Sequence, residues 1–136
     1  MSVQQNPLVY AEAFQAELQT VVGAIPVYAE FNRNWATEPK YVTWHMRNMH
    51  QPVYTGQTQS NKGIDRPMFQ ITIFAQVMAD AFGIANTILQ AMHGYTGNFG
   101  GILPVAKTDI SWLYNTYDDT TTLQQVVLDC QLDIST

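Results

Sequence analysis

The sequence predicts an α+β fold, with a mostly antiparallel β-sheet that carries two packed helices, in one compact domain over residues 1–136. Two segments repeat apolar residues at helical spacing, and five segments have the alternation or composition of strands. The length of 136 residues suits one domain, since domains cluster at roughly 100–150 residues. The order helix, strand, strand, long loop, strand, helix, strand, strand is typical of helices on one face of a sheet.

The first helix is expected over residues 7–22. Asn6 is a good N-cap, and Pro7 suits the first helical position, where its missing N–H costs nothing. Gly23 ends this helix, and Gly94 ends the second helix, over residues 79–93, in the same way. The apolar stripes are Val9, Ala13, Phe14, Leu18, Val21 and Val22 in the first helix, and Ala81, Ile84, Ala85, Ile88 and Met92 in the second.

Strands are expected over residues 26–31, 41–50, 69–77, 108–117 and 123–134. Residues 41–50 alternate as a half-buried strand does, with Val42 and Trp44 on one face and Tyr41 and Thr43 on the other. The last strand has a predicted core face of Val126, Leu128, Cys130, Leu132 and Ile134, opposite a face of Gln125, Val127, Asp129, Gln131 and Asp133.

Two segments lack a regular pattern. Residues 55–67 form the longest stretch without apolar periodicity, and loops longer than about 12 residues are uncommon and usually functional or disordered. Residues 94–101 are rich in glycine and are expected to be a turn-rich connector between helix and strand.

The composition bears on the class of protein. Charged residues make up 12% of the chain, about half the usual share of roughly 25%, so Gln, Asn, Thr and Ser must supply much of the surface. With a net charge of −5 and six scattered basic residues, direct DNA binding by the monomer is not expected. No signal peptide and no apolar run near the ~20 residues of a membrane span is visible.

The residue types that carry chemistry do not form a recognisable site. His45 and His50 lie an odd number apart on one expected strand, so they should point to opposite faces and not share a metal with each other or with His93. Asp118 and Asp119 fit a hairpin turn. Trp35, Trp44 and Trp112 fit burial in a core or interface, and Cys130 fits a small core residue. We expect no catalytic residue, metal or cofactor.

The order of motifs along the whole chain is more informative. A capped helix precedes Val27-Tyr28, then residues 39–44 (PKYVTW), a polar loop, and residues 69–75 (FQITIFA). Residues 79–89 (ADAFGIANTIL) and 92–97 (MHGYTG) follow, and an alternating strand closes the chain. Over roughly residues 7–134, this order resembles the tail-completion, or tail-terminator, family of long-tailed bacteriophages and prophages.

The resemblance implies a small sandwich-like subunit that forms a ring, commonly a hexamer, at the head-proximal end of the tail. Such a ring stops tube polymerisation and docks to the head connector. The implied partners are copies of the chain itself, the tail tube protein and the head–tail connector protein, and DNA passes through without specific binding. The implied location is the virion tail, after assembly in the host cytoplasm. No catalytic residue or cofactor belongs to the family.

Two sites in the ring follow as expectations. The polar loop is expected to order against a neighbouring subunit or another partner, through Gly56, Gln57, Thr58, Gln59, Ser60, Asn61, Lys62 and Gly63. Gln125, Asp129, Gln131 and Asp133 either form an ordinary solvent face or line the channel, where carboxylates would repel DNA. Relatives often carry a basic residue in this last strand, so the charge of the channel stays open.

Two other interpretations stay open. The chain could form another head-to-tail connector or neck ring, one layer away from the terminator. It could also be a small-ligand-binding or enzymatic α+β domain that uses its Trp and Tyr residues. An enzyme domain would be a compact monomer or dimer, whereas the first two classes form rings.

Overall fold

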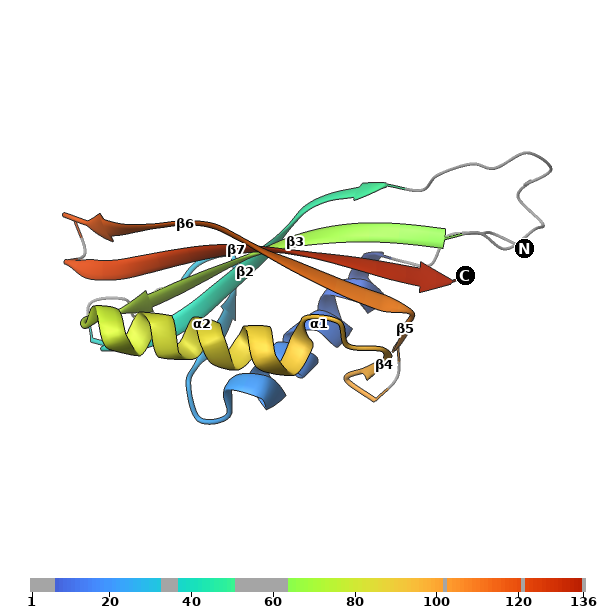
Figure 1. The fold of residues 1–136 in the computed structure, drawn as a ribbon, viewed down its shortest axis with the longest axis horizontal. Helices are drawn as coiled ribbons and strands as arrows, with labels where there is room; N and C mark the ends of the chain where they lie inside the picture. The colour runs from blue at the N-terminus through green and yellow to red at the C-terminus, as the bar shows by residue number, and fades with distance from the viewer. Residues whose placement is uncertain (1–6, 33–36, 51–63, 102, 121, 136) are drawn as a thin grey trace.

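The computed structural model describes residues 7–32, 37–50, 64–101, 103–120 and 122–135. Five strands form one sheet in the order β1-β2-β3-β7-β6, and helices α1 (Pro7–Val22) and α2 (Met78–Met92) lie on the same side of it (Figure 1). The strands are β1 (Val27–Ala29), β2 (Lys40–His50), β3 (Ile64–Ala75), β6 (Lys107–Asp118) and β7 (Leu123–Ser135). Apart from β1, which runs parallel to β2, the described strands of this sheet are antiparallel, so the predicted fold class is confirmed.

The core lies between the helices and the inner face of the sheet. Phe14 of α1 stacks on Phe69 of β3 with ring centroids 4.0 Å apart, and Trp44 of β2 meets both rings edge-on. The predicted stripe of α2 and the predicted core face of β7 are buried throughout. Each fully buried large apolar side chain contributes about 1.5–3 kcal/mol, so this layer supplies most of the stability. Neither described helix is long and apolar enough to cross a membrane.

Two β-bulges change the register of the sheet. Arg47 is the extra residue on β2, and Leu113 is the extra residue on β6. A bulge shifts the alternation of side chains beyond it. His45 and His50 were expected on opposite faces, but they pair with Gln70 and Arg66, which share one face of β3. That prediction is wrong because the bulge adds one residue between the two histidines.

The glycine-rich segment after α2 is more ordered than expected. It contains β4 (Gly97–Phe99), which pairs with β5 (Leu103–Val105) in a small hairpin that the sequence did not predict. At its turn, Gly100 has a φ of +59°, and a Cβ there would lie 3.2 Å from the Cβ of Ala16. The N–H of Gly100 donates to Glu17 Oε1 over 3.1 Å, which ties the hairpin to α1.

Strand β3 begins at Ile64, so the loop predicted over residues 55–67 is too long at its C-terminal end. The polar residues there have partners across the fold. Asp65 is buried and accepts a hydrogen bond from the hydroxyl of Tyr10 on α1, while Arg66 forms an ion pair with Asp133 of β7. These pairings let a polar sequence run as a strand, and they are invisible to local periodicity.

Candidate assembly surfaces

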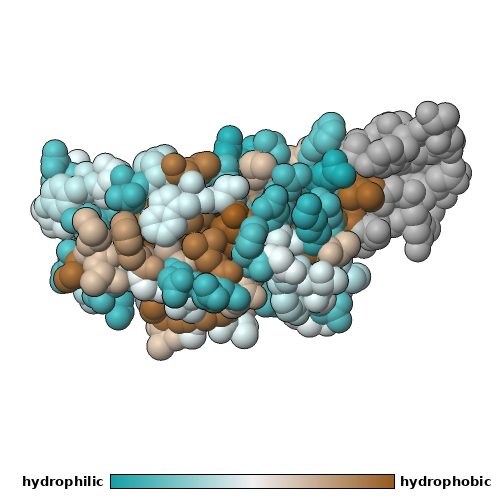
Figure 2. All heavy atoms as spheres, viewed as in Figure 1, coloured by the Kyte–Doolittle hydropathy of each residue, from teal (hydrophilic) through white to brown (hydrophobic). Residues whose placement is uncertain are grey.

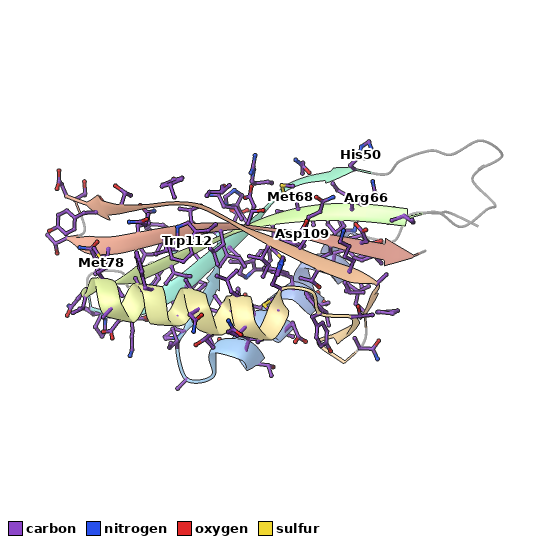
Figure 3. All side chains as sticks on the ribbon, in the orientation of Figure 1. His50, Arg66, Met68, Met78, Asp109 and Trp112 are labelled. Atoms are coloured by element: carbon purple, nitrogen blue, oxygen red, sulfur yellow. The ribbon has the colours of Figure 1, made fainter. Side chains whose placement is uncertain are left out.

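The face of the sheet opposite the helices, called the outer face below, carries the polar side of β7. Gln125, Asp129, Gln131 and Asp133 are half-buried there, beside partners on β3 and β6. Figure 3 shows His50, Arg66 and Met68 of the neighbouring strands pointing away from the helices on this same side. Whether this face lines a channel stays a prediction.

The two carboxylates that β7 contributes to this face are paired with arginines. Arg47 Nη1 reaches across β3 to Asp129 Oδ2, 2.5 Å away, and Arg66 Nε lies 3.3 Å from Asp133 Oδ1. Lys107 and Asp109 line a small hollow with Arg66, Gln131 and Asp133. The described outer face thus carries three cations beside three carboxylates at this end. The repulsive carboxylate face expected from β7 is therefore locally neutralised.

The centre of the outer face is closed to water. Thr43, Thr72 and Val127 are 7%, 8% and 1% exposed, although each lies on the side away from the helices. Tyr41 is also buried, and its ring stacks on Phe74 with centroids 4.7 Å apart. Burial, with Asp118 and Glu38 nearby, raises the pKa of Tyr41. The first half of β2 is thus buried on both faces, whereas a half-buried strand was expected.

Strand β6 forms one edge of the sheet, and its two halves differ. In the first half, the N–H of Ile110 donates to His93 Nδ1 over 3.0 Å, and the carbonyl of Thr108 accepts from the N–H of Gly94 over 2.8 Å. In the second half, the backbone groups of Asn115 and Tyr117 point to the same free side, where no described strand pairs with them. Unpaired edges of this kind are ready to meet another chain.

Apolar side chains gather beside this edge, on β6 and the first turns of α2. Trp112 packs edge-to-face on Phe82, with ring centroids 5.1 Å apart. Figure 2 looks at this edge, and Figure 3 labels Met78 and Trp112 on it. The β6–α2 surface is defined here as Met78, Phe82, Trp112 and Tyr117, whose residues are 38–50% exposed. Monomeric proteins rarely leave such apolar residues gathered at one surface.

The opposite edge of the sheet carries an apolar groove of about 520 Å³ between α1 and β1. Leu8 is 59% exposed on its wall. Two aromatic residues of the groove already use their polar groups within the chain. Trp44 Nε1 donates to Gln15 Oε1 over 2.5 Å, and the hydroxyl of Tyr28 donates to Glu38 Oε1 over 2.5 Å. The α1–β1 groove is defined here by its lining: Leu8, Ala11, Glu12, Gln15, Ala16, Val27, Tyr28, Ala29 and Trp44.

The remaining candidate residues lie as follows. The expected assembly residues 56–63 and Trp35 lie outside the residues that the structure describes. Asp118 ends β6, and its Oδ1 accepts from the N–H of Thr120 over 3.0 Å, as the predicted turn requires. No group of three or more His, Cys, Asp or Glu side chains within the described ranges could hold a metal ion.

No protein-family model matches the chain, and no curated protein matches it. Solved structures share its fold. A chain in the virion of a native gene transfer agent (GTA) particle matches with a TM-score of 0.59 and 14% identity, over 93% of this chain and 91% of that chain. A further solved structure matches with a TM-score of 0.66 and 17% identity, over 96% of both chains.

The third similar structure is the PVC sheath/tube terminator of an extracellular contractile injection system in its extended state. It matches with a TM-score of 0.58 and 11% identity over 98% of this chain. The match covers 57% of the terminator, so this chain spans little more than half of that protein's length. Likeness at such low identity establishes the fold, and the chain therefore has a tail-terminator-like fold, as the sequence resemblance implied.

Proposed function

We propose that this chain is the subunit of a tail-terminator ring, a hexamer that caps the tail tube and joins it to the head connector. The observation that carries the proposal is the match of almost the whole chain to a sheath/tube terminator. Because a fold alone does not define a function, the proposal also needs surfaces that suit a ring. It is a structural role without catalysis, in a virion assembled in the host cytoplasm.

The two edges of the sheet supply such surfaces. The β6–α2 surface and the α1–β1 groove are both apolar, they differ from each other, and they lie at opposite ends of the strand order. Contacts between unlike surfaces repeat head to tail, and they close into a ring when the rotation between subunits allows it. This arrangement supports a ring and gives no support to a compact monomer.

The outer face is the part of the subunit that we assign to the channel. Its arginine–aspartate pairs leave few unpaired charges for phosphates to bind. Gln70, Gln125 and Gln131 add polar, uncharged groups on the same face. DNA affinity depends mainly on cations that displace counterions, so a neutralised face lets DNA pass without holding it.

A neck or connector ring one layer away is the second candidate. The match to a chain of a gene transfer agent virion supports a virion component without distinguishing the two layers. A small-ligand site is less well supported. Ligand pockets combine apolar walls with a few polar groups that converge on the ligand. In this groove, the indole N–H of Trp44 and the hydroxyl of Tyr28 already donate hydrogen bonds to Gln15 and Glu38.

A polymerisation experiment tests the proposal. The tail tube protein that such a ring would cap is polymerised with and without the purified protein, and electron micrographs record tube lengths and ends. A terminator shortens the tubes and leaves a ring at one end. A neck subunit leaves tube length unchanged and binds the head connector instead, an outcome that contradicts the terminator role.

A further inference from the structure

We propose that the β6–α2 surface of one subunit packs into the α1–β1 groove of the next copy of this chain. The inference rests on the ring proposed above and assigns its subunit contact. Each subunit carries both halves of this contact at opposite edges of one sheet (Figure 1). A second copy covers both surfaces with one repeated contact, whereas an unrelated partner on either surface would leave the other exposed to water.

The chemistry of the two surfaces matches. Met78 and Tyr117 are 50% and 49% exposed on one side, and Leu8 is 59% exposed on the other. Cavities of roughly 300–1,000 Å³ enclose a drug-sized molecule, so a groove of about 520 Å³ has room for several such side chains. The fully buried centre of a protein interface is typically apolar, depleted in charge and enriched in aromatic residues and Met, as these surfaces are.

Side-chain packing, not continuation of the sheet, makes this contact. The carbonyl of Val27 on β1 already accepts from Gln15 Nε2 over 3.1 Å, and the carbonyl of Ala29 accepts from the N–H of Phe31 over 2.8 Å. With both carbonyls of its free side engaged, β1 offers a poor edge for a neighbouring strand. The free backbone groups of β6 then lie at the rim of the contact, where water can bond them.

Two substitutions each disrupt one of the two surfaces and leave the other intact. Leu8→Glu places a carboxylate on the groove, and Met78→Glu places one on the β6–α2 surface. Both positions lie in the first turn of a helix, where a negative charge interacts favourably with the helix dipole, so neither change should unfold the subunit. Gln90→Glu, on the exposed side of α2 away from both surfaces, is the control with the same added charge.

The variants are compared with the wild type by sedimentation equilibrium and negative-stain imaging, at concentrations where the wild type forms rings. Leu8→Glu and Met78→Glu should each be monomeric alone, and Gln90→Glu should form rings. An equimolar mixture of the first two should give heterodimers and nothing larger. In that mixture, the intact β6–α2 surface of Leu8→Glu meets the intact groove of Met78→Glu.

Other results overturn the inference. If both variants form rings as the wild type does, the ring uses another contact and the proposed function stands without this inference. If Leu8→Glu alone forms homodimers, the contact is isologous, through β6–α2 surfaces, and the inference is wrong. If the mixture stays monomeric, the two surfaces are not partners. A wild-type chain that never forms rings, with or without tail tubes, contradicts the proposed function itself.

Discussion

The ion pair between Arg47 and Asp129 is unequal, because its two side chains differ in their access to water. The Asp129 side chain is 13% exposed, and its Oδ1 is buried without a hydrogen-bond partner among the described residues. The Arg47 side chain is 40% exposed at the bulge of β2. The carboxylate therefore depends on the guanidinium more than the guanidinium depends on the carboxylate.

This inequality predicts different costs for removing each partner. Arg47→Met strands a largely buried carboxylate and should lower the free energy of unfolding by about 1–3 kcal/mol. Asp129→Asn releases Arg47 to water and should cost less than about 1 kcal/mol, as exposed ion pairs do. Urea denaturation at neutral pH measures both values. Equal costs, or a larger cost for Asp129→Asn, would show that the burial of Asp129 does not determine the cost of breaking the pair.

Cys130 lies fully buried on the core face of β7, as predicted from its place in the alternation. Burial, with smaller effects of Asp109 and Asp129, raises the pKa of its thiol to about 12 from 9.0. Between these values the unfolded chain releases a proton that the folded chain retains, so this group lowers stability as pH rises above about 9.

The same burial predicts that the thiol is inert in the folded protein. At pH 8 a disulfide reagent such as DTNB should label Cys130 only after denaturant is added, because the thiolate is the reactive form and the folded site disfavours it. Absorbance during labelling, with and without denaturant, makes the measurement. Rapid labelling of the folded protein would place Cys130 outside the core.

At the scale of elements, residue spacing predicted the features that depend only on residues near one another in the sequence. The stripe of α2 and the two faces of β7 follow from spacing alone, and each was predicted from sequence. The hairpin of β4 and β5 was missed because its strands have three residues each, too few for a visible alternation. The bulges at Arg47 and Leu113 were missed because register depends on the partner strand.

The candidate surfaces were less predictable from sequence. The polar face of β7 was identified, but the arginine that pairs with Asp129 lies 82 residues away along the chain and only the fold brings it close. The β6–α2 surface was also missed, because nothing local shows that β6 is an edge strand. Its signal was Trp112, a large aromatic residue in a segment otherwise rich in polar residues.

Helix α2 begins without a side-chain cap. Its N-cap is Val77, which is 54% exposed and makes no side-chain hydrogen bond to the helix. Val77→Asp should raise the free energy of unfolding by about 1 kcal/mol, because Asp caps the free N–H groups of the first turn. Thermal unfolding of Val77→Asp, compared with Val77→Ala as a control, tests this. Two equally stable variants would mean that the cap is already satisfied by water.

For the whole molecule, the channel hypothesis predicts how DNA responds to added charge. The earlier candidates Asp129 and Asp133 are ion-paired, so lysines there would break two pairs beside Arg47 and Arg66. Gln125→Lys with Gln131→Lys adds charge to the same face without removing an ion pair. Rings of this double variant should bind duplex DNA with an affinity that falls as salt rises, whereas wild-type rings should not bind.

The matched control puts two lysines at Thr87 and Gln90, on the exposed side of α2. Fluorescence anisotropy of labelled duplex DNA, measured over a range of salt concentrations, compares the two double variants. Equal DNA binding by both would mean that the added charge acts through the whole surface and that the outer face has no special access to DNA. Loss of rings in the first variant would place Gln125 or Gln131 in a subunit contact instead.

The measurement that tests the central claim most directly is a cryo-EM reconstruction of the purified protein at the ends of tail tubes. The account predicts a closed ring of six subunits on one tube end, with the outer face of each sheet towards the lumen. In that ring, the β6–α2 surface of each subunit should lie against the α1–β1 groove of the next. Bare tube ends beside a monomeric protein, or a ring with Asp129 and Asp133 on its outer wall, would contradict the account.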